Sequence, residues 1–407
     1  MVRHETRLAE GQSGQAAPLT PHQVRLLLSP AGRDAVAFAQ RLDLTGPARL
    51  PAAEAVRAQA GPVLGPLALE QALLRRRAAA KHPRGEELWW TADALEQSSS
   101  HQVAAHRVAR FEGAARVLDL GCSVGGDLLA FAAVGPATGV DRDEARLLLA
   151  GANAAVLDVA VTLACADVTR LRLPAGSDVF ADPSRRSGGR RVFDPRGYSP
   201  PLDTVLAWLP ALRTLGVKVA PGIDYEHLPP ELEIEVVSLH GEVKEAVLWG
   251  GAARRGRRRQ ATLLPAGDTL TDAPVGPPPV RALGRYLLDP DPAVVRAHVV
   301  AELAARLDGW LLDATIAYIS ADDARPTPFG NWFEVVDVLP FSLKGLRTRL
   351  RALDAGSVVV KKRGTAVEPD ELRRRLRLTG GSEVTVVLTR QAGRQVAIVV
   401  RRVSFPG

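Results

Sequence analysis

The stretch VLDLGCSVGGD at residues 117–127 decides the fold of this chain. A short apolar run ends in a loop of small residues, and a helical stretch, Asp127–Ala133, follows directly. Gly121 and Gly125 predict a loop that lies close against a bulky ligand, because glycine has no side chain to prevent that approach. The helix would present free N–H groups and its positive dipole end to a carboxylate of the ligand. Asp119, just before the loop, is placed to orient the loop or to bind an amino group.

Short apolar runs and helical stretches alternate around this loop. The runs expected to form buried strands are Val117–Leu120, Ala137–Val140, Val159–Leu163, Asp178–Ala181 and Gly216–Ala220. Such alternation is typical of crossover units in a mostly parallel sheet. Glu233–Leu239 and Glu245–Leu248 are separated only by a short turn, which forces these two strands to pair antiparallel.

Three acidic residues are expected at the carboxyl ends of three successive strands. Asp141 follows the second strand, where a carboxylate can accept two hydrogen bonds from ribose hydroxyls. Asp167 follows the third strand region and can accept a hydrogen bond from an adenine amino group, with Val168 packed on the ring. Together with Asp119 they converge on the edge where open α/β sheets bind ligands.

The loop and its acids resemble the D-x-G-x-G-x-G pattern of class I methyltransferases, with Ser123 in place of the middle glycine. This resemblance implies S-adenosyl-L-methionine as the cofactor. A nicotinamide dehydrogenase fits less well, because its G-x-G-x-x-G pattern has no acid just before it. Gln97 and Ser98, in the polar stretch 91–100, are the candidates to close over the methionine end of the cofactor. A helix cap before His101–Phe111 is an equally good interpretation of that stretch.

The fourth strand ends in DPSRR at residues 182–186, the position that faces the methyl acceptor in class I methyltransferases. Methylases of exocyclic amines carry N/D-P-P-aromatic here, so the first two residues match and the aromatic residue is missing. Arginines in this segment could hold a phosphate bidentately, or the segment is a solvated loop. The candidates for catalysis are Asp182, Pro183 and Arg185, and those for substrate binding are Arg186 and, as stacking aromatics, Phe193 and Tyr198.

Two other chemistries fit this half of the chain poorly. A lysine-centred ribose methylation is disfavoured because Lys218 and Lys244 are the only lysines in the relevant half. Attack by a cysteine thiolate on a pyrimidine ring needs a thiol that faces the acceptor. Cys122 lies in the loop expected to bind the cofactor, and Cys165 lies in the third strand region.

The flanking regions predict further parts of the chain. Residues 1–20 are expected to be a flexible leader, and 21–110 a helical domain without strand-like alternation. The methyltransferase-like domain is expected at 111–262, followed at 263–331 by a linker with one connecting helix, which begins after Asp291 and ends near Leu307. A small α+β domain is expected at 332–407. Its expected elements are strands 333–339 and 357–362, helices 343–353 and 369–376, and a closing hairpin of 383–389 with 395–402.

Several segments taken together resemble bacterial class I methyltransferases that carry a C-terminal THUMP-like domain. They are EQSSSHQVAAHRVARF, VLDLGCSVGGDLLAFA, DVFADPSRRSGGRRVFDPRGYSPPL and the tail LPFSLKGLRTRLRALDAGSVVVKKRGTAVEPDELRRRL. The resemblance implies an α/β fold: a Rossmann-like seven-stranded sheet, an N-terminal helical domain and a small C-terminal α+β domain. Since THUMP domains recognise structured RNA, it also implies a tRNA or rRNA substrate. Lys361 and Lys362 would suit phosphate contacts, or are exposed strand-end charges.

Composition limits the remaining classes of function. A net charge of +7 suits a polyanionic partner, or reflects an arginine-biased composition. Two cysteines and no histidine–cysteine cluster at ligand spacing argue against a disulfide framework and a bound metal. No apolar signal core and no membrane-length apolar run occur, so we expect a cytoplasmic protein. The oligomeric state is not indicated.

These observations favour an enzyme that uses S-adenosylmethionine to methylate a base in RNA. Two alternatives stay open. One is a small-molecule methyltransferase whose basic tail is structural, and the other is a non-catalytic cofactor-binding protein that interacts with RNA.

Overall fold

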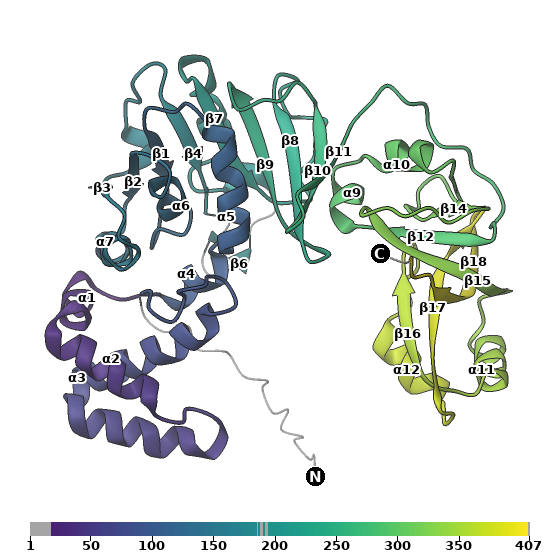
Figure 1. Cartoon of the computed structure of the whole chain (residues 1–407), viewed down its shortest axis with the longest axis horizontal. Coiled ribbons are helices and arrows are strands. Elements are labelled where there is room, and N and C mark those ends of the chain that lie inside the picture. The colour runs from purple at the N-terminus through teal and green to yellow at the C-terminus, as the bar shows by residue number, and fades with distance from the viewer. Residues whose placement is uncertain (1–17, 185, 188–189, 192–193, 406–407) are drawn as a thin grey trace, which may run out of the picture. The chain divides into compact units, whose positions relative to one another are not determined.

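A computed structural model describes residues 18–184, 186–187, 190–191 and 194–405 (Figure 1). The chain divides into two compact units. The first unit comprises the described residues up to His101 together with Gly121–Arg170, and the second comprises Gln102–Leu120 and the described residues from Leu171 onward. Each unit is described by itself below.

The first unit opens with helices, as the sequence predicts for this region. They are α1 (Pro21–Leu28), α2 (Pro30–Arg41), α3 (Arg49–Ala78) and α4 (Ala92–Gln97). Thr20 and Gln23 form a capping box at the start of α1, and Ser29 caps α2. Within α3, Gly61 has a φ of +81°, so the helix is kinked there. The buried faces of these helices form one apolar core with residues of α7 such as Leu149.

The rest of the first unit carries two strands and two helices. Strands β2 (Ala137–Asp141) and β3 (Val161–Cys165) pair in parallel. Helix α6 (Leu128–Ala132) follows the loop at residues 121–126, called the glycine loop below, and α7 (Glu144–Leu157) connects β2 to β3. Asp143 caps α7 by accepting hydrogen bonds from the backbone N–H groups of its first turn. These elements match the predicted crossover pattern.

The second unit begins with α5 (His101–Val108) and contains a seven-stranded mixed sheet in the order β11-β10-β8-β9-β7-β4-β1. The bounds are β1 Val117–Leu120, β4 Asp178–Ala181, β7 Thr214–Val219, β8 Glu233–Leu239, β9 Glu242–Gly251, β10 Arg259–Leu264 and β11 Asp268–Thr271. β1, β4 and β7 run parallel, and β9 is antiparallel to β8, as the sequence predicts. β9 is also antiparallel to β7. Residues 186–187 (β5) and 190–191 (β6) pair as a separate ribbon, and α8 spans Leu202–Leu206.

The sequence predicts seven strands for the methyltransferase-like region, but nine are present. Seven of them lie in the second unit, and β2 and β3 lie in the first. The additional strands are β10 and β11. The sequence predicts that the methyltransferase-like domain ends at residue 262 and that a linker follows. Instead, residues 259–264 pair in parallel with β8 and return through β11. The strand was not predicted because β10 begins with Arg259 and directly follows a run of arginines, which hides its apolar pattern.

A second sheet in this unit has the order β13-β14-β12-β15-β18-β17-β16. Its elements are β12 (Tyr286–Pro290), β13 (Trp310–Leu311), β14 (Ile319–Ala321), β15 (Gly330–Pro340), α11 (Leu343–Ala352), β16 (Ala355–Lys362), α12 (Pro369–Leu376), β17 (Ser382–Gln391) and β18 (Arg394–Arg402). The helices and strands predicted for 333–402 are present. Leu346 and Leu350 of α11 and Leu372 and Leu376 of α12 pack on one face of the sheet.

The segment 263–331, expected to be a linker with one helix, contributes β12, β13 and β14 to the second sheet. The sequence predicts one helix after Asp291, but the structure has two, α9 (Pro292–Arg296) and α10 (Val300–Arg306). They are separated at His298, whose φ of +57° lies in the left-handed region. The sequence between the two helices holds neither Gly nor Pro, so nothing in its composition signals the break.

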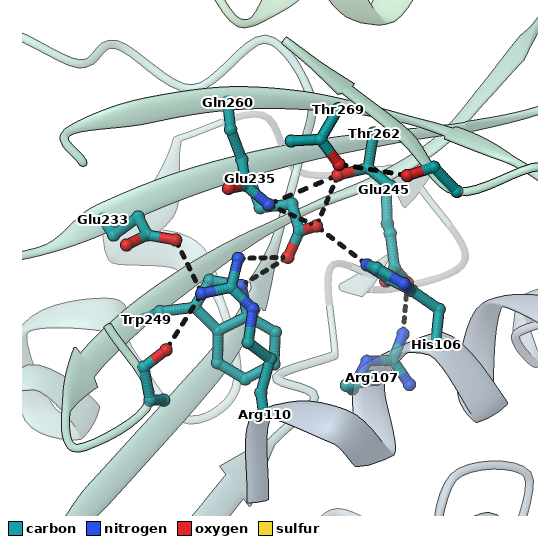
Figure 2. A network of polar contacts seen from close by, with 12 residues as sticks. His106, Arg107, Arg110, Glu233, Glu235, Glu245, Trp249, Gln260, Thr262 and Thr269 are labelled. Carbon is teal, nitrogen blue, oxygen red and sulfur yellow. Dashed lines mark hydrogen bonds and ion pairs between the residues drawn. The ribbon is translucent and has the colours of Figure 1, made fainter. Parts of the chain in front are cut away.

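A cluster of buried charges joins α5 and the 3-10 turn Ala109–Phe111 to the first sheet of the second unit (Figure 2). Arg110 binds Glu233 at 2.6 Å and Glu235 at 3.1 Å, and all three side chains are at most 1% exposed. His106 lies 2.8 Å from the other oxygen of Glu235, and Arg107 pairs with Glu245. Charges this deeply buried are tolerated only when each is paired and hydrogen-bonded.

Glu235 is the centre of this cluster. Besides its two basic neighbours it accepts hydrogen bonds from Trp249 Nε1 at 2.8 Å, and from Gln260 Nε2 and Thr262 Oγ1 at 2.7 Å each. Burial alone would raise the pKa of Glu235. The hydrogen bond with His106 and the charge of Arg110 outweigh burial and hold this pKa well below its usual range.

Among the described residues, no helix combines the length and apolar character that crossing a membrane would require. Over the same residues, His, Cys, Asp and Glu side chains form no group of three or more that could hold a metal ion.

We predict that Glu235→Gln lowers the free energy of unfolding by about 3–5 kcal/mol at neutral pH, because it leaves Arg110 and His106 without their shared carboxylate. The depressed pKa of Glu235 contributes stability above the unfolded-state pKa of about 4.5, and this contribution is lost as the pH falls below that value. Urea unfolding of the wild type should therefore weaken between pH 5 and 3 more steeply than that of the variant.

The matched control is Glu371→Gln. Glu371 is an exposed α12 carboxylate that pairs with Arg375, so its replacement should change the unfolding free energy by less than about 0.5 kcal/mol. Equal effects of the two substitutions would contradict the role given to Glu235.

Candidate functional site

The glycine loop of the first unit is fixed by the end of β2. The N–H groups of Gly121 and Cys122 donate to the carbonyl oxygen of Val140, at 2.8 and 3.1 Å. Gly121 and Gly125 have φ values of +89° and +97°, and Ser123 adopts +51°. Gly121 and Gly125 therefore stand at positions that need a positive φ, which glycine adopts without strain. Ser123 adopts the left-handed conformation at an energetic cost.

Asp141 organises this loop directly. Its Oδ2 accepts a hydrogen bond from Ser123 N at 2.9 Å, and its Oδ1 accepts one from Asp143 N at 2.9 Å. A carboxylate has about four acceptor positions, so both oxygens can still receive hydrogen bonds from a diol. Arg146 adds a contact to the loop by donating to Ser123 Oγ at 3.3 Å.

Ser98 lies against the last glycine of the loop. A Cβ atom added to Gly126 would be 2.3 Å from Ser98 Oγ, so these two positions are packed together. Ser98 closes α4 through a backbone hydrogen bond to Ala94, and Lys81 Nζ donates to the carbonyl oxygens of Glu96 and Ser98. The structure thus brings Ser98 to the glycine loop.

Gln97, the other candidate in this stretch, is exposed at the end of α4. Its side chain has the acceptor and donor groups that a methionine carboxylate or amino group needs. Its proposed contact with the cofactor stays a prediction.

Asp167 and Val168 follow β3 at the same edge as Asp141. Ala166 N donates to the carbonyl oxygen of Asp141 at 3.0 Å, which places the two strand ends side by side. Asp167 is exposed, and hydrogen bonds from the side chain and the backbone of Thr169 lower its pKa. Val168 is half-buried. An anionic acceptor beside a partly exposed apolar side chain suits an adenine ring and its amino group.

These groups fit S-adenosylmethionine. Asp141 offers acceptors for the ribose, Asp167 and Val168 offer an edge and a face for the adenine, and the glycine loop allows the backbone to approach the ligand. The crowding at Gly126 indicates that even a methyl group would change the spacing between loop and α4.

Asp119 lies in the second unit, in β1, and is only 1% exposed. It pairs in register with Phe180 of β4, so its carboxylate is inside the protein rather than on an open edge. The two roles expected for Asp119, orienting the loop or binding an amino group, stay predictions.

The acceptor-side candidates Asp182 and Pro183 follow β4 in the second unit. Asp182 N donates to the carbonyl oxygen of Leu120 at 3.3 Å. Asp182 Oδ2 is 2.8 Å from Nζ of Lys218, and these side chains are 28% and 5% exposed. Pro183 is buried. A buried lysine therefore fixes a partly exposed carboxylate at the carboxyl end of the parallel strands.

The pairing of Lys218 with Asp182 was not predicted from the sequence, which disfavoured Lys218 only as the centre of a ribose methylation. Lys218 interrupts the apolar run LGVKVA of β7, and this interruption was the available signal, because a charge in a buried strand requires a partner. Lys244, in contrast, is paired with Glu242 in an exposed position.

The structure describes only some of the aromatic and basic candidates predicted after Pro183. Tyr198 is 3% exposed and accepts a hydrogen bond from Ala220 N at 3.4 Å, so its ring is packed inside the domain. A stacking role for Tyr198 stays a prediction, although this packing offers no open ring face. Arg185 and Phe193 lie outside the described residues, and Arg186 is placed only through the backbone of β5.

The two lysines predicted for phosphate contacts lie at the end of β16. Lys361 pairs with Asp289 and Lys362 pairs with Glu368, at 2.8 and 2.7 Å. Each lysine is 32% exposed and already paired with a carboxylate of the chain, so a phosphate would have to share it with Asp289 or Glu368. Their RNA contacts stay predictions.

Comparison with known proteins adds two family matches and several relatives. A family described as THUMP domain-like matches residues 330–402, and a domain of unknown function (DUF8688) matches residues 20–78. A crystal structure from Porphyromonas gingivalis W83, named as a candidate methyltransferase, covers 94% of this chain and 98% of that chain. Its TM-score is 0.70 at 20% identity, which shows a shared fold.

Two proteins from Mycobacterium tuberculosis strains CDC 1551 and H37Rv resemble the chain more closely in sequence. Each is named an uncharacterized S-adenosylmethionine-dependent methyltransferase and is 41% identical over 354 residues, which is 84% of this chain and 97% of the relative. Identity at this level over almost the whole relative, together with the glycine loop and Asp141, shows that this chain belongs to the family of S-adenosylmethionine-dependent methyltransferases, with S-adenosylmethionine as its cofactor.

Proposed function

We propose that this chain is a cytoplasmic enzyme that methylates a base in RNA, either tRNA or rRNA. The observation that carries the proposal is the presence of a THUMP domain-like region, residues 330–402, in the same chain as a methyltransferase-family sheet. A domain related to RNA-binding modules serves no evident purpose in an enzyme whose acceptor is a small metabolite. The net charge of +7 also favours a polyanionic acceptor.

The first unit holds the cofactor in this proposal. Asp141 accepts hydrogen bonds from the ribose hydroxyls, Asp167 accepts one from the adenine amino group, and Val168 packs against the ring. The bound cofactor supplies an electrophilic methyl group on a sulfonium centre. The chain's contribution is to hold that methyl group in line with the acceptor atom, which converts binding energy into rate.

Asp182 is the acceptor-side group. Lys218 occupies its Oδ2 and fixes the orientation of the carboxylate, while the 28% exposure of the Asp182 side chain leaves it accessible to a base. The carboxylate accepts a hydrogen bond from the attacking group or removes its proton. Lys218 is therefore a positioning residue in this proposal.

The proposal is tested by incubating the purified chain with methyl-labelled cofactor and total RNA from a strain that lacks the protein, followed by nucleoside mapping. Label in one modified nucleoside is the expected result. Label found only in a small-molecule extract would establish the small-molecule alternative, and cofactor binding without any transfer would establish a non-catalytic role.

We predict that Asp141→Ala weakens cofactor binding by about 100-fold or more, because two charge-assisted hydrogen bonds to the ribose are lost at about 1.5–3 kcal/mol each. Calorimetric titration with the cofactor measures this change. Glu144→Gln, on an exposed α7 side chain that pairs with Arg25, is the control and should leave affinity unchanged. If Asp141→Ala binds the cofactor with wild-type affinity, Asp141 does not bind the ribose.

Gly126→Ala tests the packing of the glycine loop. The new methyl group must displace Ser98 Oγ, so we expect a cost of about 1–3 kcal/mol in cofactor binding. In a Ser98→Ala background the nearest atom is Ser98 Cβ at 3.5 Å, an ordinary contact, and the cost of Gly126→Ala should largely vanish. A double-mutant cycle with no coupling would show that the two positions do not meet as described.

Asp182→Asn and Lys218→Met should each lower kcat by about 100-fold or more while cofactor affinity stays at the wild-type value. Lys218→Arg keeps the positive partner of Asp182 and should recover part of the loss. Single-turnover methyl transfer measures these effects. Lys244→Met, which removes an exposed lysine of the same sheet, should have no effect, and a comparable loss there would refute the positioning role of Lys218.

A further inference from the structure

The loop between β9 and β10 presents three exposed arginines, Arg254, Arg255 and Arg257, within the sequence ARRGRRR. Among the described residues, no partner forms a hydrogen bond or an ion pair with these three side chains; Arg255 contacts Glu233 through its backbone N–H. Three uncompensated guanidinium groups on one short loop repel one another. Their solvent-exposed charges create a local positive potential that favours the binding of a polyanion.

The backbone of this loop is nevertheless held firmly. The carbonyl oxygen of Ala253 accepts a hydrogen bond from the buried Arg110 at 2.9 Å, and Arg255 N donates to Glu233 Oε2 at 2.6 Å. The loop is thus attached to the buried cluster drawn in Figure 2. A loop fixed in this way presents its side chains without first having to order its backbone.

Arg258 fixes the far end of the loop. Its guanidinium donates to the carbonyl oxygens of Leu228, Pro229 and Leu232. The N–H groups of Arg258 and Arg259 donate to Asp272 Oδ1 at 3.1 and 3.2 Å. The loop therefore divides its arginines into one that binds the protein and three that point to solvent.

Two further arginines, Arg259 of β10 and Arg296 of α9, lie near His298. Burial lowers the pKa of His298, and the nearby charges of Arg259 and Arg296 lower it further, while Asp224 acts in the opposite direction. Arg296 is exposed, and a Cβ added to Gly222 would be 3.6 Å from its guanidinium. Arg259 and Arg296 thus continue the basic surface beyond the loop.

The basic residues of the C-terminal helices differ from this loop. Arg373 pairs with Asp370 and Arg375 pairs with Glu371 on α12, so their charges are partly neutralised within the helix. Lys361 and Lys362 also have carboxylate partners. The β9–β10 loop is the better candidate for binding an external anion.

We infer that Arg254, Arg255 and Arg257 bind the phosphate backbone of the RNA acceptor, away from the nucleotide that is methylated. The inference rests on the proposed function. Arginine binds phosphate oxygens through a planar, bidentate fork and needs no particular base sequence to do so. The loop follows β9, which is antiparallel to β7, so it lies at the opposite edge of the sheet from Asp182.

The distance between Asp182 and the β9–β10 loop determines which ligands can contact both of them. The six residues of β7 span roughly 20 Å at about 3.3 Å per residue. A small metabolite cannot contact Asp182 and the arginine loop together, whereas a folded polynucleotide can. The loop thus gives the proposed enzyme a means of distinguishing a structured RNA from a free nucleotide.

The test compares the full chain with the variant R254A/R255A/R257A in binding fluorescein-labelled bulk tRNA at a series of salt concentrations. Removing three phosphate contacts should reduce the slope of log affinity against log salt by about 2–3, because fewer counterions are released on binding. The variant R254K/R255K/R257K keeps the charges and should retain most of the slope. Thermal unfolding reports whether each variant keeps its fold, and if the alanine variant unfolds, R254Q/R255Q/R257Q removes the same three charges and should show the same reduced slope.

The control variant R49A/R57A/R77A removes three exposed arginines from α3 and the same total charge. It should leave the salt slope close to that of the wild type. An equal loss in the control, or an unchanged slope in R254A/R255A/R257A, overturns the inference. Loss of binding to phosphatidylglycerol vesicles with unchanged tRNA binding would also overturn it, in favour of a membrane surface.

The outcomes for the loop and for the proposed function can be told apart. If RNA accepts the labelled methyl group but the slope does not change, the loop inference fails and the function stands. If tRNA binding depends on the three arginines but no RNA is methylated, the loop is supported as a binding surface and the proposed enzyme activity fails.

Discussion

A carboxylate buried in the middle of a sheet is stable only where the protein supplies enough donors and positive charge to replace water, and Glu235 imposes this requirement on the second unit. Arg110, His106, Trp249, Gln260 and Thr262 all direct polar groups to it. These residues come from the segment before β1 and from β9 and β10, so the charge can be accommodated only when strands distant in sequence are in register. The same arginine also holds the carbonyl oxygen of Ala253, which links the interior of the sheet to its arginine loop.

The first unit depends on a carboxylate of a different kind. Asp141 is at a strand end, and it gives one hydrogen bond acceptor to the glycine loop and another to the start of α7. The loop is therefore preorganised by the same residue that is proposed to receive the ribose. This dual use explains why a short loop with a non-glycine residue, Ser123, at positive φ can keep its shape.

Much of this could be predicted from the sequence because the signals are local. The bounds of β1 and β4 follow from short apolar runs, and α12 follows from its periodicity and its Pro at the start. The ends of parallel strands share an edge, so Asp141 and Asp167 were placed together correctly. The pairing of β12 with β15 has no local signal, because it joins segments separated by two helices and two strands.

The partners of buried charges were equally hidden from the sequence. Lys218 was visible as an anomaly in an apolar strand, but its pairing with Asp182 depends on which strands become neighbours. The chemistry of a lone charged residue shows that it requires a partner. Only the three-dimensional arrangement identifies that partner.

Asn153 connects the N-terminal helical region to the glycine loop through hydrogen bonds to Trp89 and Val124. Its amide accepts a hydrogen bond from Trp89 N at 2.7 Å and donates to the carbonyl oxygens of Trp89 and Val124, at 3.0 and 2.9 Å. Neither a carboxylate nor an aliphatic side chain can accept and donate in this way. The helical region is consequently part of the first unit's folding core: a truncated chain that begins after it would leave the amide of Asn153 without Trp89, and so weaken the support that Asn153 gives to the glycine loop at Val124.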